Sequence, residues 1–278
     1  MKLQVLAITL LQHFSNAFVV SNSRIKTTEL FGSVRGLESG KDTSVEPTEG
    51  GMVLYVKAAE DGKSVGDCPF TQYVRMVLEE KGLDYDVRPC TAETKPQWLI
   101  ELYEGKMPAL RHRRECYTES EVIAQYLEFF FSGDEYASLA KPKKKEMAEA
   151  SEVVGKIFPA LAKYLKHTPD GDDEDDELKS GLCEALNLLE AHLTSEGRTG
   201  PFIVGDGEHV TLLDCNLAPK LYHMKVGVTA FKDNAVGVDD DFPAVAGYIN
   251  TIFNRESFTK TKYPEETIVW GWGNARSK

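Results

Sequence analysis

The stretch Gly66-Asp67-Cys68-Pro69-Phe70-Thr71 has the residue types of a nucleophilic cysteine site. Proline is favoured at the first position of a helix, so we expect a helix to begin at Pro69 with Cys68 as its N-cap. The free N–H groups and the positive end of the helix dipole stabilise a thiolate there. Cysteine is a poorer cap than Ser, Thr or Asp, which makes a purely structural role the weaker interpretation. We therefore predict that Cys68 is a reactive nucleophile.

Thr71 stands where a dithiol site would have its second cysteine. The stretch Cys68-Pro69-Phe70-Thr71 cannot close a disulfide within itself. Cys90 is the next cysteine along the chain, but we expect it to pack at the end of a strand. An oxidised Cys68 would then be resolved by a diffusible thiol, and glutathione is the obvious one.

Two further stretches could bind such a peptide-like thiol. Gly105-Lys106-Met107-Pro108 places a proline at the start of a strand, and a cis peptide bond there would leave the Met107 backbone free to pair with a ligand. Glu119 and Ser120 precede an apolar run at a predicted helix start, where they could bind an ammonium and a carboxylate. Simple helix capping is the alternative for this pair.

The elements that must position these residues follow a recognisable order. Apolar and β-branched runs predict strands at 52–57 and 85–88 and a hairpin over 107–117, and helical periodicity predicts helices at 69–81, 95–103 and 119–131. The resulting order, βαβαββα over residues 51–133, is that of a thioredoxin-like α/β domain with a mixed sheet.

Residues 134–278 are expected to form an all-helical domain, because only helical periodicity appears there, at 142–166, 178–194, 211–228 and 242–254. The acidic run 170–177 is interpreted as a solvated loop, since its spacing does not fit a calcium-binding EF-hand. Thr211 and Asp214 have the spacing of a capping box, which favours a structural aspartate over a catalytic one. We predict no metal site.

The composition excludes some classes of partner. The net charge of −12 makes the chain a poor ligand for nucleic acid or an anionic membrane surface. The five cysteines are odd in number and widely spaced, which indicates a reduced compartment rather than a disulfide framework.

Residues 1–50 have the composition of a targeting presequence. A short apolar run at 3–11 is followed by Ser15-Asn16-Ala17, a candidate cleavage site, and residues 20–35 are rich in Ser, Thr and basic residues. With Phe18 after the cleavage site, this resembles the bipartite plastid presequences of algae with secondary plastids. We expect plastid targeting, with residues 1–50 absent from the mature fold or disordered. Secretion and a cytosolic chain with a disordered tail are the alternatives.

From about Val53 to Trp272 the chain resembles the dehydroascorbate reductases of the glutathione transferase superfamily. The stretches that carry the resemblance are Lys57-Ala58-Ala59, Gly66-Asp67-Cys68-Pro69-Phe70, Lys95-Pro96-Gln97-Trp98, Gly105-Lys106-Met107-Pro108, Glu119-Ser120-Glu121, Leu217-Ala218-Pro219-Lys220-Leu221-Tyr222-His223 and Ser257-Phe258-Thr259-Lys260-Thr261. The resemblance implies a thioredoxin-like domain followed by a helical bundle, and a monomeric enzyme that uses glutathione to reduce dehydroascorbate to ascorbate without a bound cofactor.

The resemblance also assigns roles to residues. It implies that Cys68 is catalytic and that Lys57 and Asp67 bind dehydroascorbate. The residues that it implies for glutathione binding are Phe70, Lys95, Lys106, Met107, Pro108, Glu119 and Ser120. Two positions depart from the family pattern, which usually has serine at Thr71 and aspartate at Glu119.

Two other functions share most of these residues. The first is a glutathione-dependent thioltransferase of the omega or glutaredoxin kind, which would act on mixed disulfides. The second is a binding or membrane protein like the intracellular chloride channels, although no stable membrane insertion is expected. We interpret His223 as a core or interdomain residue, and Trp270 and Trp272 as residues that pack the C-terminal tail onto the body.

Overall fold

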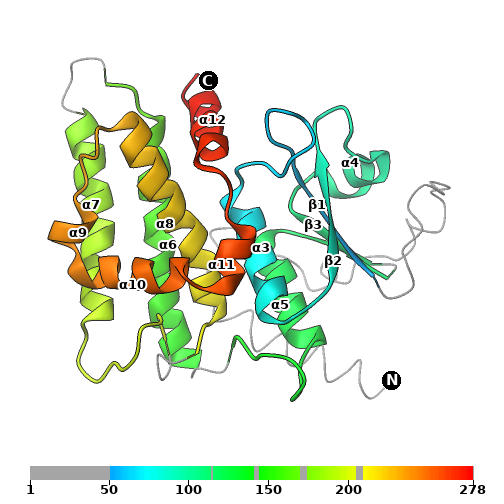
Figure 1. Ribbon diagram of the computed structural model, residues 1–278, viewed down its shortest axis with the longest axis horizontal. Helices are drawn as coiled ribbons and strands as arrows, with labels where there is room; N and C mark the ends of the chain where they lie inside the picture. Colours follow the sequence, from blue (N-terminus) through cyan, green and yellow to red (C-terminus); the bar gives the residue numbers. More distant parts are fainter. Residues whose placement is uncertain (1–50, 114, 141–143, 170–173, 205–208, 278) are drawn as a thin grey trace.

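The computed structural model describes residues 51–277 except 114, 141–143, 170–173 and 205–208. The presequence predicted for residues 1–50 and part of the acidic run lie outside the described residues. The first half of the described chain is a four-stranded sheet with helices on both faces, and the second half is helical (Figure 1). The predicted fold class, a thioredoxin-like domain followed by a helical bundle, is confirmed.

The N-terminal half has the predicted order of elements. They are β1 (Met52–Lys57), α3 (Pro69–Glu80), β2 (Tyr85–Cys90), α4 (Gln97–Tyr103), β3 (Ala109–His112), β4 (Glu115–Thr118) and α5 (Ser120–Phe130). The strand order is β2-β1-β3-β4, with β1 parallel to β2 and antiparallel to β3. The apolar strand β1 is central because side chains on both of its faces are buried.

The two faces of β1 contribute to different parts of the core. Leu54 and Val56 belong to the large core that α3 and α5 share with the helical half, whereas Val53 and Tyr55 pack in a small cluster with Leu99 of α4. Figure 1 shows this layering, with α4 beyond the sheet and α3 and α5 between the sheet and the bundle. Helix α3 is thus placed at the boundary between the two halves.

The helical half extends further than the sequence predicted. Its elements are α6 (Lys144–Lys166), α7 (Glu174–Leu193), α8 (Leu212–Phe231), α9 (Val238–Asp241), α10 (Pro243–Phe253), α11 (Glu256–Thr261) and α12 (Glu265–Arg276). Helix α7 begins within the acidic run. The carboxylates at 174–177 occupy its first turn, where they interact favourably with the positive end of the helix dipole. The periodicity did not indicate α11 and α12, both of which reach the boundary with the N-terminal half.

Charged side chains join the two halves at the C-terminal end of α3. The Lys81 ammonium is fully buried and donates to the carbonyl oxygens of Phe131 and Ala137, each at 2.9 Å, beside Glu128. Arg255, which follows α10, donates to Glu80 at 2.7 Å. These contacts hold α3 against α5 and against the turn between α10 and α11.

The capping box predicted at Thr211 and Asp214 is present at the start of α8. The buried Asp214 carboxylate accepts hydrogen bonds from the backbone N–H of Ile203 and the hydroxyl of Tyr248, each at 3.0 Å. Burial raises the pKa of Asp214, and its hydrogen bonds oppose that rise. Asp214 is therefore a structural residue that anchors α8, the helix that faces α3.

Candidate active site

Gly66 brings the predicted nucleophile to the end of the central strand. The Gly66 N–H donates to the Lys57 carbonyl oxygen at 2.7 Å, so the loop after β1 folds back onto the strand. A Cβ at position 66 would lie 2.7 Å from the Ala58 carbonyl oxygen, which leaves room only for glycine. Asp67 and Cys68 follow directly and lie beside the last residue of β1.

Cys68 occupies the predicted N-cap of α3. Its backbone is extended (φ −69°, ψ 114°), Pro69 begins the helix, and the N–H groups of Thr71 and Gln72 both donate to the Cys68 carbonyl oxygen at 3.1 Å. The thiol is half-buried and not in a disulfide. Proline at the first helical position and the extended cap are the local signals that the sequence carried.

The protonation of Cys68 differs from the expectation of a strongly stabilised thiolate. Burial raises the pKa of the Cys68 thiol, and the Asp67 carboxylate raises it further. The backbone N–H groups of Thr71 and Phe70 and the Thr71 hydroxyl act in the opposite direction. The helix start therefore favours the thiolate, as predicted, but desolvation outweighs that effect.

Lys57 and Asp67 form an ion pair next to the cysteine. The Lys57 ammonium lies 2.7 Å from Asp67 Oδ1 and 5.1 Å from the centre of the Trp270 ring of α12. The Asp67 side chain is 14% exposed and that of Lys57 47%, so the pair is reachable from solvent on the lysine side. It offers a hydrogen-bond donor and an acceptor to a polar substrate beside Cys68.

Aromatic side chains from both halves lie near the start of α3. Phe70 meets Phe158 of α6 edge to face at 5.3 Å between ring centres, and Phe158 lies 6.3 Å from Trp272. Phe70 is 37% exposed. These rings form an apolar cluster between the halves, and Phe70 offers part of its ring to a small organic molecule near Cys68.

Two titratable residues of α8 lie next to these aromatic side chains. The Lys220 ammonium lies 5.9 Å from the Phe70 ring centre, and burial lowers the pKa of Lys220 to about 8 although Glu121 opposes the change. Burial likewise lowers the pKa of His223 to about 4, and its Nδ1 accepts a hydrogen bond from the Trp272 indole at 3.2 Å. His223 is therefore neutral and buried, in line with its interpretation as an interdomain residue.

The register of the sheet brings the predicted glutathione residues to the same edge as Lys57. Ala109 pairs with both Tyr55 of β1 and Thr118 of β4. The segment before Ala109, with Met107 and Pro108, is thus adjacent to the segment after Thr118, with Glu119 and Ser120. The peptide bond between Met107 and Pro108 is cis, which is the condition under which we expect the Met107 backbone to pair with a ligand.

The remaining predicted residues surround this edge. Lys95 donates to the Gly105 carbonyl oxygen at 2.7 Å and so supports the loop before Met107. The exposed Lys106 ammonium lies 3.5 Å from the Glu119 carboxylate. Glu119 has a left-handed backbone (φ 69°), which turns the chain into α5 and places Ser120 at the helix start. Phe70 lies in the first turn of α3, where it contacts Phe158 of α6.

A residue that sequence reasoning missed holds Cys68 from the C-terminal side. The Tyr263 hydroxyl donates to the Cys68 carbonyl oxygen at 3.0 Å, and the backbone carbonyl of Tyr263 accepts from the Tyr222 hydroxyl at 3.0 Å. Arg75 of α3 donates to the Thr261 carbonyl oxygen at 3.1 Å. The segment between α11 and α12 is thereby fixed to the start of α3. Tyr263 is far from Cys68 along the chain, so no local sequence pattern connects the two residues.

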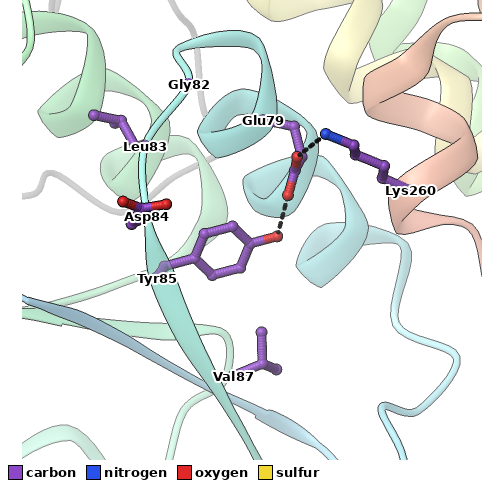
Figure 2. Close-up of a pocket in the computed structure, with 7 residues that line it drawn as sticks. All are labelled: Glu79, Gly82, Leu83, Asp84, Tyr85, Val87 and Lys260. Carbon is purple, nitrogen blue, oxygen red and sulfur yellow. Dashed lines mark hydrogen bonds and ion pairs between the residues drawn. The ribbon is translucent and has the colours of Figure 1, made fainter.

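A separate polar cleft lies at the other end of α3. It has a volume of about 440 Å³ and is lined by residues 82–85, Val87, Glu79 and Lys260. Figure 2 shows the Glu79 carboxylate bridging the Tyr85 hydroxyl, at 3.0 Å, and the Lys260 ammonium, at 3.6 Å. The twelve residues of α3 separate this cleft from Cys68, a span of about 18 Å. Its lining residues include no cysteine or serine nucleophile, and its Glu79 and Lys260 are paired with each other.

None of the described helices is long and apolar enough to cross a membrane. Within the same residues, no group of three or more His, Cys, Asp or Glu side chains is arranged to hold a metal ion.

Comparison with known proteins assigns the family. The family described as glutathione S-transferase, N-terminal domain, matches residues 64–134. The chain is 36% identical to the glutathione S-transferase DHAR2 of Arabidopsis thaliana over 221 residues, which cover 79% of this chain and 95% of that protein. This chain belongs to the dehydroascorbate reductase group of the glutathione S-transferase superfamily. The resemblance stated from the sequence is confirmed.

Other members of the superfamily extend this result. The chloroplastic DHAR3 of Arabidopsis thaliana is 32% identical over 256 residues, which cover 91% of each chain. The crystal structure of Chlamydomonas reinhardtii dehydroascorbate reductase is 27% identical, with a TM-score of 0.67, and the match covers 81% of this chain and 98% of that one. The chain is therefore a dehydroascorbate-reductase-like glutathione transferase, from a superfamily that uses glutathione as co-substrate.

Proposed function

We propose that this protein reduces dehydroascorbate to ascorbate with two molecules of glutathione, through the Cys68 sulfur. The observation that carries the proposal is the Lys57–Asp67 ion pair beside Cys68, with Lys57 Nζ 2.7 Å from Asp67 Oδ1. A nucleophile alone suits any thiol exchange. A donor and an acceptor next to it, with the aromatic ring of Phe70 nearby, suit a small polyhydroxylated ring.

In the first step, the Cys68 thiolate adds to a carbonyl carbon of dehydroascorbate. The new C–S bond then breaks with its electron pair on carbon, which gives the ascorbate enediolate, while a water oxygen bonds to the sulfur and leaves a sulfenic acid. The carbon skeleton gains two electrons and the sulfur loses two. The Lys57 ammonium would stabilise the negative charge that develops on the substrate oxygens, and Asp67 would accept hydrogen bonds from its hydroxyl groups.

Glutathione restores the thiol in two further steps. The first molecule attacks the sulfenic acid, water leaves, and a mixed disulfide forms on Cys68. The second attacks that disulfide, which releases glutathione disulfide and the Cys68 thiolate. Thr71 provides no competing thiol, so the mixed disulfide persists until the second molecule arrives. No bound cofactor enters the cycle.

The residues at the sheet edge are proposed to hold glutathione for both steps. The cysteinyl backbone of glutathione would pair with Met107 next to Pro108. Ser120 and the α5 start would bind the γ-glutamyl carboxylate, and Glu119 would bind the ammonium. Lys95 and Lys106 would attract the glycyl carboxylate electrostatically, and Phe70 would lie beside the bound thiol.

The test compares the purified protein with its Cys68→Ser variant. Glutathione-dependent formation of ascorbate, followed by absorbance, should be rapid in the wild type and lost in the variant. A matched control is Cys183→Ser, which changes a half-buried cysteine on α7 and should keep full activity. Slow turnover of dehydroascorbate with rapid reduction of a glutathione mixed disulfide would instead assign the protein as a thioltransferase.

We also propose that the protein is a plastid enzyme and a monomer. Relatives named as chloroplastic occur in Arabidopsis thaliana and rice. A fluorescent protein fused to residues 1–50 should reach the plastid. A fusion to residues 20–50 lacks the apolar run, so it should not enter the secretory pathway and should not reach the plastid. Light scattering after size-exclusion chromatography should give the mass of one chain.

A further inference from the structure

Three consecutive residues of the C-terminal helix contact three residues around Cys68. Trp270 faces Lys57, Gly271 lies against Asp67, and Trp272 contacts His223. Helix α12, red in Figure 1, stands at the boundary between the halves beside the start of α3. The segment packs on the body, as the sequence predicted, and it also brings α12 against the Lys57–Asp67 pair.

The contact at Gly271 is the tightest of the three. A Cβ at position 271 would overlap the Asp67 carboxylate and lie 2.9 Å from Asp67 Cβ. Aspartate has a short side chain, so turning the carboxylate aside does not relieve a clash that also involves its Cβ. Gly271 is buried within a helix, where glycine costs stability relative to alanine. The close approach of Asp67 explains why glycine occupies this position despite that cost.

The flanking tryptophans fix the helix in this position. The Trp272 indole N–H donates to His223 Nδ1, and its ring lies 6.3 Å from Phe158. Trp270 places the face of its ring 5.1 Å from the Lys57 ammonium. The Lys57–Asp67 pair is thereby held between β1 and α12, with a cation–π contact on the lysine and the bare backbone of Gly271 on the aspartate.

We propose that Gly271 is a positioning residue for Asp67, and that α12 thereby sets the preference for dehydroascorbate over glutathione mixed disulfides. The inference rests on the proposed function, because it gives the Lys57–Asp67 pair the task of binding dehydroascorbate. A mixed disulfide would be held by the sheet edge at Met107 and Ser120, which α12 does not define. Displacing Asp67 should therefore affect the two reactions differently.

The experiment compares Gly271→Ala with Gly273→Ala in the full chain. Both changes exchange glycine for alanine in the same helix, but a Cβ at 273 meets no atom within 4 Å. We expect Gly271→Ala to raise the KM for dehydroascorbate about tenfold, since small misplacements of positioning groups have effects of this size or larger. Its reduction of a glutathione mixed disulfide should stay within about twofold of the wild type, because the sheet edge that holds glutathione is unchanged. Gly273→Ala should match the wild type in both reactions.

A second measurement reads the position of Asp67 without any turnover. The rate at which iodoacetamide alkylates Cys68, measured against pH, reports how strongly the Asp67 carboxylate acts on the thiol. The pH at which the alkylation rate is half-maximal should shift in Gly271→Ala and stay unchanged in Gly273→Ala. Circular dichroism and melting temperature identify a variant that fails to fold. In that case Trp270→Phe, which keeps Gly271 and weakens the contact with Lys57, should raise the KM for dehydroascorbate in the same direction.

The outcomes separate this inference from the proposed function. If Gly271→Ala matches Gly273→Ala in both KM and the alkylation profile, Gly271 does not position Asp67. If the wild type does not reduce dehydroascorbate, the proposed function fails, but the alkylation profiles still decide whether Gly271 positions Asp67. If both reactions fall equally in a folded Gly271→Ala, the helix supports Cys68 itself and the preference for dehydroascorbate has another origin.

Discussion

The Tyr263 hydroxyl donates a hydrogen bond to the backbone carbonyl oxygen of Cys68 at 3.0 Å, between residues that are 195 positions apart. The bond joins the C-terminal segment to the one backbone group that also begins helix α3, because Thr71 and Gln72 donate to the same oxygen. The orientation of the nucleophile thus depends on the chain's last helices as well as on its own loop.

Tyr263→Phe should therefore affect both stability and reactivity. The carbonyl keeps its two backbone donors, so the loss is that of one hydrogen bond, about 1 kcal/mol in the free energy of unfolding. We expect kcat for dehydroascorbate to fall several-fold while the KM for glutathione stays unchanged, since the sheet edge does not contact Tyr263. Urea unfolding and steady-state kinetics measure the two effects. An unchanged kcat in a variant that is destabilised as expected would reduce Tyr263 to a structural role.

The ion pair beside Cys68 leads to opposite predictions for its two members. The Asp67 carboxylate raises the pKa of the Cys68 thiol, so Asp67→Asn should lower that pKa and increase the thiolate fraction at pH 7. Lys57→Ala leaves the carboxylate without its partner and should raise the pKa further. We expect alkylation by iodoacetamide at pH 7 to become several-fold faster in the first variant and slower in the second, because the thiolate is the reacting species.

Both variants should nevertheless lose efficiency with dehydroascorbate, because each removes a group from the proposed substrate pocket. Faster alkylation combined with a lower kcat/KM in Asp67→Asn would separate thiol activation from substrate binding. The control is Asp86→Asn, which changes an exposed carboxylate on β2. Equal alkylation rates in the wild type and both variants would show that the pair does not act on Cys68.

The glutathione site can be tested at Glu119. Lys106 lies 3.5 Å from two carboxylates, those of Glu119 and Glu104, but only Glu119 is at the α5 start where the γ-glutamyl ammonium is expected. Glu119→Gln should weaken glutathione binding about tenfold, the effect of losing one charge-assisted hydrogen bond at an exposed site. Glu104→Gln should have little effect. Isothermal titration calorimetry with the Cys68→Ser protein measures both affinities, and equal losses would indicate a general charge effect on Lys106.

The sequence predicted those parts of the site that depend on short-range rules. Pro69 after Cys68 indicates a helix start, and the cis bond before Pro108 and the cap at Glu119 are likewise local. Their meeting at one sheet edge followed from the thioredoxin-like order, because that order fixes which strand ends are adjacent. The family resemblance then supplied Lys57 and Asp67, which no local pattern identifies.

The parts that the sequence missed arise from long-range packing. Tyr263 and Gly271 act on residues that are far away along the chain, and neither carries a pattern of its own beyond a glycine between two tryptophans. The protonation of Cys68 depends on long-range packing as well. The helix start is visible in the sequence, but the burial that outweighs it comes from the surrounding segments and from Asp67. Desolvation depends on the whole fold and cannot be read from the motif.

The last prediction concerns the stability of the helical half. The Lys232 side chain is 2% exposed, and its ammonium contacts the Asp175 carboxylate and donates to the His167 carbonyl oxygen at 3.1 Å. These contacts join the end of α8 to the end of α6 and the start of α7. Asp175→Asn leaves a buried ammonium without its counter-charge, so we expect a loss of about 2 kcal/mol in the free energy of unfolding at pH 7. Asp176→Asn, its exposed neighbour, should change little.

This loss should depend on pH in a defined direction. Burial raises the pKa of Asp175, but hydrogen bonds from Lys232 and His167 outweigh burial and lower the pKa below its ordinary value of 3.8. A carboxylate with a depressed pKa in the folded state stabilises the protein fully above its unfolded pKa, and that contribution disappears as the pH falls through the folded one. The difference in the free energy of unfolding between the wild type and Asp175→Asn should therefore be constant from pH 7 to about pH 5 and shrink below about pH 4. Urea unfolding at pH 7, 5 and 3.5 measures it, and a gap that persists unchanged at the lowest pH would mean that the charge of Asp175 is not what stabilises this junction.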